Sequence, residues 1–346
     1  MLSPIRIVVC TDKNYLPGAF VTLGSLLDSN GGKDEFILHV LDTGIGNAGR
    51  GDLEKFIAEF PNAQLRFHTI DASSFKDFPP GVGGNFSTYA RLLIGSLVDS
   101  PRCVYIDTDF LVLKDVANLW RMETGDKILW AIRNYRSTTG IPDSLDYDCP
   151  FLPPEEAAKF PYYCMGIFLC DLDKWRQLGI EEKAFDTAIR FEGKLRLFDQ
   201  TIFNYLLRGQ IGELEREWSH FTDHAPLSAE NNYHYINYKK PWGRKDFYAA
   251  NFLWREYYRI RIQPYFRFKK PWKIRLFNIA WELRTFFFAL CFTEKYIDFL
   301  RKKGKPKVIT DATRNTLNEY RRWLLHGPDP QSRTTLLNLK NFWKSR

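Results

Sequence analysis

The fold is decided by one stretch of the chain, which reads Cys-Val-Tyr-Ile-Asp-Thr-Asp-Phe-Leu-Val-Leu over residues 103–113. The apolar runs on either side of its acidic triplet are typical of a buried strand in the centre of an α/β sheet. Asp107 and Asp109 are two residues apart, so on a strand their side chains point to the same side. Two neighbouring carboxylates at a strand's end are costly unless a positive charge lies between them. A divalent cation that holds a phosphate-bearing ligand would supply that charge, and a turn with two solvated aspartates is the alternative.

Strands and helices alternate along the first part of the chain. The hydrophobic pattern predicts strands at 5–10, 36–41 and 65–70, with helices at 16–28 and 51–60 between them. This order predicts a parallel sheet with helices packed on both faces.

Polar residues follow two of the predicted strands at the end where such sheets bind ligands. Asp12 and Asn14 come after the first strand, as Asp107 and Asp109 come after the central one. Ligands bind outside the carboxyl ends of the strands in open α/β sheets. We therefore expect these four side chains at the same edge of the sheet.

The pattern of alternation continues to about residue 207. It predicts a helix at 87–97 that carries Arg91, strands at 128–132 and 163–170, and helices at 171–178 and 198–207. The stretch 138–160 is rich in Pro, Asp and Gly, so we expect a long loop there. Long loops beside an active edge commonly form lids or acceptor walls.

The charge is unevenly distributed along the 346 residues. From 254 to 346 the chain has 22 Lys and Arg residues and 7 Asp and Glu residues, a net charge of +15, which leaves −7 on the remainder of a chain whose total is +8. We therefore predict a catalytic domain at 1–253 and a basic, aromatic, mainly helical C-terminal region at 254–346. Such a region suits an anionic membrane surface, with a nucleic-acid arm or an ordinary packing layer as alternatives.

The cysteines and the apolar runs bear on the expected compartment. Six cysteines are scattered without metal-binding spacing, which is typical of reduced thiols in a cytosolic protein. The N-terminus enters a strand directly and lacks the apolar core of a signal peptide. The longest apolar run of the tail, 285–293, is too short to span a bilayer. We expect a cytoplasmic protein attached to a membrane from the cytoplasmic side.

Six motifs carry a resemblance to a known family. They read V-V-C-T-D-K-N-Y at 8–15, S-T-Y-A-R-L-L-I-G at 87–95, Y-I-D-T-D at 105–109, Y-Y-C-M-G-I-F-L-C-D-L-D-K-W-R at 162–176, F-D-Q-T-I-F-N at 198–204 and H-Y-I-N-Y-K-K-P-W at 234–242. In kind, order and spacing the chain resembles glycosyltransferase family 8 over roughly residues 5–245. Within that family it is similar to the bacterial galactosyl- and glucosyltransferases that extend lipopolysaccharide.

The resemblance implies a fold, a reaction and a metal. The fold is GT-A, a Rossmann-like α/β fold with a mixed, mostly parallel central sheet. The reaction is retaining transfer of a hexose from a UDP-sugar, with Mn²⁺ or Mg²⁺, to an oligosaccharide or glycolipid at the cytoplasmic face of the inner membrane. Asp107 and Asp109 match the family's metal-binding pair, and His234 matches its third protein ligand. No nucleic-acid partner is implied, and the oligomeric state stays open.

The resemblance also implies which residues bind the donor. Asp199 and Gln200 match the family's catalytic D-Q pair, in which Asp199 would hold sugar hydroxyls and Gln200 would lie near the reacting carbon. Lys240 matches a lysine that meets the diphosphate, where its ammonium would neutralise charge on the departing UDP. The residues that it implies for donor binding are Cys10, Thr11, Asp12, Asn14, Arg91, Asp107, Thr108, Asp109, Cys164, Gly166, Asp199, Gln200, His234, Asn237 and Lys240.

Three positions depart from the family pattern. Cys164 replaces an Asn that touches the donor sugar, Asn237 replaces a Gly, and Thr201 replaces the second Asp of a D-Q-D motif. The departures at Cys164 and Asn237 support an alternative function, a catalytically weak or inactive module that binds nucleotide-sugar or glycan. For an active enzyme, no carboxylate of these motifs must be a nucleophile, so front-face exchange is favoured over double displacement.

Overall fold

The computed structural model describes residues 3–79, 81, 86–135, 143–221, 227–236, 240–243, 249–268, 293–305, 314, 317–318, 321–322, 325 and 330–346. These residues form two compact units. The first unit falls within 1–220 and 230–234, and the second within 221–229 and 235–346.

A seven-stranded sheet forms the centre of the first unit. Its strands are β1 (Ile5–Thr11), β2 (Phe36–Asp42), β3 (Ala63–Thr69), β4 (Arg102–Ile106), β6 (Leu129–Arg133), β7 (Tyr163–Asp171) and β8 (Ile211–Leu214). Their order across the sheet is β3-β2-β1-β4-β7-β6-β8. β7 runs antiparallel to both of its neighbours, and every other pair is parallel. The predicted mixed, mostly parallel sheet is confirmed.

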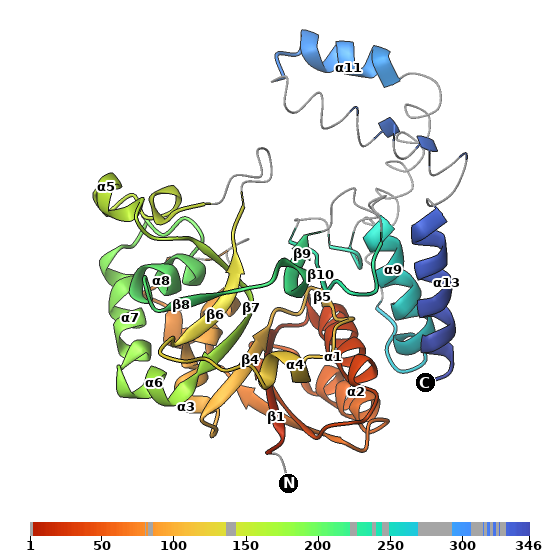
Figure 1. Cartoon of the computed structure of the whole chain (residues 1–346), viewed down its shortest axis with the longest axis horizontal. Coiled ribbons are helices and arrows are strands. Elements are labelled where there is room, and N and C mark those ends of the chain that lie inside the picture. Colours follow the sequence, from red (N-terminus) through yellow and green to blue (C-terminus); the bar gives the residue numbers. More distant parts are fainter. Residues whose placement is uncertain are drawn as a thin grey trace. The chain divides into compact units, whose positions relative to one another are not determined.

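Helices cover the sheet on both sides, as Figure 1 shows. The helices α1 (Leu16–Asn30) and α2 (Asn47–Ile57) connect the first three strands and lie on one side. The other side carries the 3₁₀ helix η3 (Ser87–Leu93) and the helices α3 (Ile94–Leu97), α6 (Leu172–Gln177), α7 (Ile180–Arg190) and α8 (Asp199–Leu206).

Short elements complete the first unit. They are η1 (Ala72–Phe75), α4 (Ala117–Trp120), η4 (Leu145–Tyr147), α5 (Pro154–Ala157) and η5 (Arg216–Ser219). A small sheet of order β5-β10-β9 is made by Phe110–Leu111, Tyr233–His234 and His220–Phe221. This small sheet brings His234 next to the end of β4, because β10 pairs with β5 only four residues after β4 ends.

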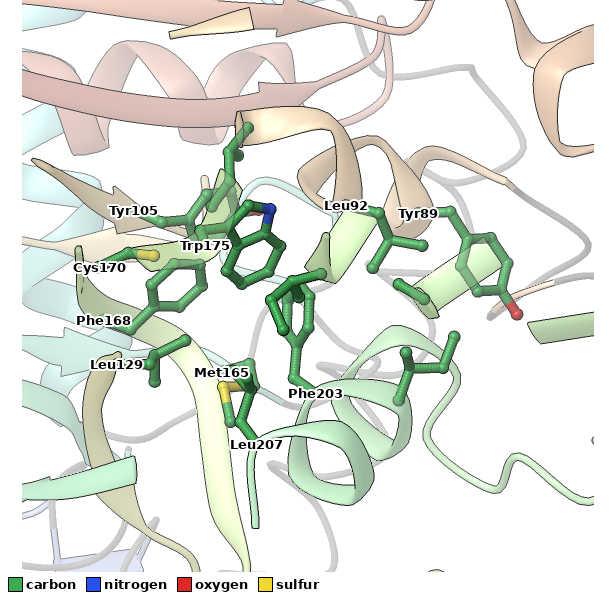
Figure 2. Packing of buried hydrophobic residues seen from close by; sticks show 14 of the residues in the cluster. Tyr89, Leu92, Tyr105, Leu129, Met165, Phe168, Cys170, Trp175, Phe203 and Leu207 are labelled. Carbon is green, nitrogen blue, oxygen red and sulfur yellow. The ribbon is translucent and has the colours of Figure 1, made fainter. Parts of the chain in front are cut away.

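Aromatic packing between the sheet and α6 and α8 supports the end of β4. Figure 2 shows Tyr105 beside Phe168, whose ring stacks on it at 4.9 Å between centroids. Trp175 and Phe203 pack edge to face at 5.3 Å in the same cluster. Trp175 also lies where a Cβ on Gly95 would stand, 2.5 Å from its Cδ1, so only glycine fits there. Tyr105 is thus held rigidly two residues before Asp107.

Three predicted elements differ in detail. The strand predicted to end in Asp107 and Asp109 stops at Ile106, and residues 107–109 form a turn between β4 and β5. Asp107 and Asp109 are therefore not on a strand, and their side chains are not aligned by strand geometry as expected. The helix predicted at 87–97 is a 3₁₀ helix followed by one α-helical turn, and the loop predicted at 138–160 contains η4 and α5 within its described part.

The second unit packs its last helix against an earlier one. Its helices are α9 (Ala249–Tyr257), the π-helix η6 (Tyr258–Ile262), α11 (Thr293–Lys302) and α13 (Pro330–Lys344). The ring of Trp343 meets that of Tyr257 edge to face at 5.0 Å, and Lys340 pairs with Glu256 at 2.9 Å. The second unit also includes residues 235–253, which precede the predicted boundary, and the functional boundary at 253/254 stays a prediction.

Part of the predicted membrane region lies outside the described residues. This holds for Lys269, Lys270, Trp272, Lys273, Arg275, Phe277, Trp281, the apolar run up to residue 292 and Cys291. Among the helices that are described, none combines the length and the apolar character needed to cross a bilayer. The five described cysteines are free thiols, and Cys10 is the one of them that is not fully buried.

Candidate metal centre

A cavity of about 230 Å³ lies where β1 and β4 end side by side. β1 is the point at which the chain's path through the sheet reverses, since β2 lies on one side of it and β4 on the other. Ligands bind at such switch points in open α/β sheets. The lining residues are Cys10, Thr11, Asp12, Tyr15, Ser87, Thr88, Arg91, Tyr105, Asp107, Thr108 and Asp109.

Asp107, Asp109 and His234 converge beside this cavity. Each offers one ligand atom, and these atoms all lie within 4.8 Å of one another. Nε2 of His234 is 3.3 Å from Oδ1 of Asp109 and 4.0 Å from Oδ2 of Asp107. The structure therefore brings together the three side chains predicted to bind a metal.

The imidazole ring of His234 is held in place by several neighbouring residues. Its imidazole stacks on Phe110 at 4.2 Å, and Nδ1 lies 3.3 Å from the hydroxyl of Ser219. A Cβ on Gly166 would stand 2.2 Å from its Cε1, so no larger residue fits at that position without moving the ring. Ser219 on one ring nitrogen leaves the other nitrogen, Nε2, for the carboxylates or a metal.

The electrostatics of the cluster favour a cation. Burial alone would lower the pKa of His234, but the Asp109 carboxylate and its hydrogen bond raise that pKa to about 9. Burial raises the pKa of Asp107, and the Asp109 carboxylate adds to this although Arg91 opposes it. Two carboxylate oxygens and one imidazole nitrogen are hard and borderline ligands that suit Mn²⁺ or Mg²⁺. The residues present therefore fit a divalent cation.

Arg91 is the centre of a charge network rather than a solvated helix residue. Its Nε is 2.6 Å from Oδ2 of Asp199, and its Nη1 is 3.3 Å from Oδ1 of Asp107. Nη1 also donates to the carbonyl of Met165 at 2.6 Å, and the guanidinium lies over the Tyr105 ring at 4.8 Å. Burial acts against its charge, but the two carboxylates raise the pKa of Arg91. Arg91 thus joins the metal cluster to the predicted D-Q pair.

Asp199 and Gln200 open α8 directly behind this network. Asp199 is 2% exposed and accepts a hydrogen bond from Thr88, and burial raises its pKa to about 6. Phe198, which precedes it, has φ 52°, a conformation that is rare for any residue but glycine. Such strain persists where the surrounding structure imposes it, and it is common at functional sites.

The backbone of the C-M-G motif connects these parts. The carbonyl of Met165 accepts from Arg91, and its N–H donates to Oε1 of Gln200 at 3.1 Å. The carbonyl of Gly166 accepts from the N–H of Asp107 at 2.8 Å. Sequence reasoning missed this role, because a backbone group leaves no signal in the identity of a residue.

Two side chains at the site also went unpredicted. The Tyr105 hydroxyl donates to Oδ1 of Asp107 at 2.8 Å, and Ser219 contacts His234. Tyr105 could have been predicted, because it stands two residues before Asp107 on the same predicted strand and so points to the same side. Ser219 could not, because 15 residues separate it from His234 and no motif links them.

Asp12 and Asn14, which were predicted to bind the donor, lie in the turn after β1. Asp12 accepts hydrogen bonds at Oδ1 from the backbone N–H groups of Asn14 and Tyr15, at 2.8 and 2.9 Å. Thr108 donates to the carbonyl of Cys10 at 3.2 Å, which ties the acidic turn to this end of β1. Cys10, Thr11, Asp12 and Thr108 line the cavity, whereas Asn14 is exposed and is not part of its lining.

Three predicted site residues remain, namely Cys164, Lys240 and Asn237. Cys164 is buried, and its thiol hydrogen-bonds His234, which contributes to the raised pKa of that imidazole. Lys240 belongs to the second unit, where its Nζ donates to the carbonyl of Tyr235 at 2.6 Å. Asn237 falls outside the described residues.

Comparison with known proteins identifies a family to which this chain is similar. Residues 6–246 match the family described as glycosyl transferase family 8. General stress protein A of Bacillus subtilis is 27% identical over 223 residues, which cover 62% of this chain and 73% of that protein. A putative glycosyltransferase of Haemophilus influenzae is 22% identical over 262 residues, with 70% and 74% covered.

The fold also resembles that of solved glycosyltransferase structures. The crystal structure of the galactosyltransferase LgtC, in complex with donor and acceptor sugar analogues, superposes with a TM-score of 0.61. The match covers 73% of this chain and 94% of that chain at 22% sequence identity. At this identity the likeness establishes the fold and leaves the substrates to other arguments.

Proposed function

The chain belongs to glycosyl transferase family 8, and from this premise we propose that it is a metal-dependent, retaining hexosyltransferase that uses a UDP-sugar. Its fold is the GT-A fold predicted from sequence, as in LgtC. Membership of the family implies a nucleotide-sugar donor and a glycan acceptor. The proposal adds that the sugar is galactose or glucose and that the metal is Mn²⁺ or Mg²⁺.

One observation carries the proposal: the cluster of Asp107, Asp109 and His234 stands beside the cavity at the carboxyl ends of β1 and β4. A divalent cation bound there would stabilise the charge that develops on a departing diphosphate. Asp12 and Thr108 line the cavity next to it, in the position that a nucleoside takes at a switch point.

The sugar would be oriented by the residues behind the metal cluster. Asp199 and Gln200 are fixed by Arg91 and Met165, so they can meet a sugar without reorganising. No further carboxylate is needed in this arrangement, which supports front-face exchange and retention of configuration.

We propose lipopolysaccharide or another surface glycan as the acceptor, reached from the cytoplasmic face of the inner membrane. The support is the basic C-terminal region, whose net charge is +15 from 254 to 346. Its helix α11 exposes Phe299 next to Arg301 and Lys302, a combination that suits a membrane interface.

A donor screen tests the proposed function. UDP-glucose, UDP-galactose and their N-acetyl forms are each incubated with the protein and Mn²⁺, and released UDP is measured. We expect release from UDP-galactose or UDP-glucose above the rate from the N-acetyl forms. UDP binding without release from any of the four would instead support the module that binds without turnover, to which the Cys164 and Asn237 departures point.

A further inference from the structure

The side-chain carboxamide of Gln200 is held at both of its ends. Its Oε1 accepts from the backbone N–H of Met165 at 3.1 Å, and its Nε2 donates to the hydroxyl oxygen of Tyr162 at 3.2 Å. A backbone N–H can only donate, so the oxygen of the carboxamide must be the end that faces Met165. The contacts thus select one of the two orientations that differ by a 180° turn of the carboxamide.

The Tyr162 hydroxyl leads on to a buried carboxylate. It donates to Oδ2 of Asp148, which also accepts from Oγ1 of Thr201 at 3.4 Å. Asp148 is 1% exposed, and Tyr162 and Thr201 are fully buried. An ionised carboxylate can only accept, so the Tyr162 hydroxyl must donate to Asp148 and accept from Gln200. In each hydrogen bond from Met165 through Gln200 and Tyr162 to Asp148, the donor is therefore the group nearer to Met165. Bonds that share a direction and end on a charge strengthen one another.

Asp148 and Tyr162 come from a segment, residues 143–162, with a small core of its own. Leu145, Cys149, Ala157 and Tyr162 form this core. Its two ends are joined by the backbone, since the N–H of Leu145 donates to the carbonyl of Phe160 at 2.9 Å. The segment that the sequence predicts as a loop is therefore a packed element, and it determines where the Tyr162 hydroxyl stands.

We propose that Asp148 and Tyr162 are positioning residues, which hold the Gln200 carboxamide in a single orientation for the donor sugar. This rests on the proposed function, in which Gln200 lies near the reacting carbon. In that orientation one N–H and one lone pair of the carboxamide stay available to the sugar, each at a fixed place. Without the tyrosine hydroxyl the Met165 N–H still favours the same orientation, but the Nε2 end of the carboxamide is no longer held in place for the sugar.

A double-mutant cycle tests this in the full-length protein. Tyr162→Phe removes the hydroxyl alone, and we expect kcat to fall about tenfold, the equivalent of one hydrogen bond, with KM for the donor nearly unchanged. In a Gln200→Ala background the same change should cost nothing further. An equal loss in both backgrounds, or no loss in either, would overturn the proposal. Tyr205→Phe is the matched control, because Tyr205 packs on the same small core while its hydroxyl takes no part in the network.

A second measurement does not depend on turnover. The two Nε2 proton resonances of Gln200, assigned by their absence in Gln200→Ala, report the bond to Tyr162 directly. We expect Tyr162→Phe to shift them and Tyr205→Phe to leave them in place. If no UDP-sugar is turned over by the wild-type protein, the proposed function fails while this spectrum still decides the positioning. Resonances of Gln200 that are unmoved by Tyr162→Phe would overturn it.

Discussion

At the scale of single residues, Gly166 limits where the ring of His234 can lie in the candidate metal site. The first prediction is that Gly166→Ala weakens Mn²⁺ binding at least about tenfold, since the added Cβ would stand 2.2 Å from the imidazole and displace it. Isothermal titration with Mn²⁺ measures this. Gly51→Ala is the control, because a Cβ there meets nothing within 4 Å. An unchanged affinity in Gly166→Ala would mean that His234 is not a ligand.

A second prediction at this scale concerns stability in acid. The rings of His39 and His68 stack, and their nitrogens lie 2.9 Å apart. Burial, with His68 and Arg66, lowers the pKa of His39 from 6.5 to about 4. Between these values the unfolded chain binds more protons, so the pair's contribution to stability is complete above pH 6.5 and declines as pH falls towards 4.

The urea midpoint of the wild-type protein should therefore fall between pH 7 and pH 5 by more than that of His39→Gln. The side chain of His39 is 2% exposed, so solvent does not screen the effect. If both proteins lose the same amount over this range, the imidazole pair does not control the acid response.

At the scale of elements, helix α13 is part of the second unit's core. Trp343 is 1% exposed and packs against Tyr257 of α9. The third prediction is that Trp343→Ala destabilises this unit by about 3–5 kcal/mol, the usual cost of removing a buried aromatic ring. Amide hydrogen exchange should speed up in α9 and η6 and not in β1 or β4. Leu337→Ala, at a site on the same helix that is 59% exposed, should leave exchange unchanged. Equal effects of both substitutions would show that α13 does not pack as described.

The elements also show what the sequence could predict. Strands β1 to β3 and their helices follow from hydrophobic periodicity, because each is a long and regular pattern. Asp107 and Asp109 were predicted at the end of the central strand, whereas they lie in the turn that follows β4, because an apolar run does not show at which residue the strand ends. Strand β8 and helix α7 were not predicted. The stretch 138–160 was predicted as a loop, since its content of Pro, Asp and Gly does not reveal the small core that residues 145–162 form.

The candidate site also has parts that the sequence predicts and parts that it does not. The metal cluster could be predicted from three side chains in motifs, and the structure brings them together. The Met165 backbone, Ser219 and the bonds from Gln200 to Asp148 depend on the approach of distant segments, which no local pattern encodes. The roles assigned to the individual site residues, those of Asn14, Asn237 and Lys240 included, stay predictions.

At the scale of the whole molecule, an acidic body is joined to a basic C-terminal region. The fourth prediction is that replacing Arg301, Lys302, Lys303 and Lys305 with Gln weakens binding to vesicles containing anionic lipid, by about 1 kcal/mol per residue at low salt. All four are exposed, so folding should be little affected. Flotation with vesicles measures the bound fraction, and salt should lower it in the wild-type protein.

The matched control replaces Lys55, Lys76, Lys159 and Lys194 of the first unit, which are also exposed. If both quadruple variants lose the same affinity, binding follows net charge and the C-terminal region has no special role. A wild-type protein that does not bind such vesicles at low salt would remove the membrane from the proposal.

The central claim is that Asp107, Asp109 and His234 hold a divalent cation on which sugar transfer depends. UDP release from the preferred UDP-sugar, with Mn²⁺ and with EDTA, in the wild-type protein and in Asp109→Asn, tests it most directly. We predict release by the wild-type protein with Mn²⁺, and background rates both in EDTA and in Asp109→Asn at an unchanged melting temperature. Full activity of the wild-type protein in EDTA, or of Asp109→Asn with Mn²⁺, would contradict the claim.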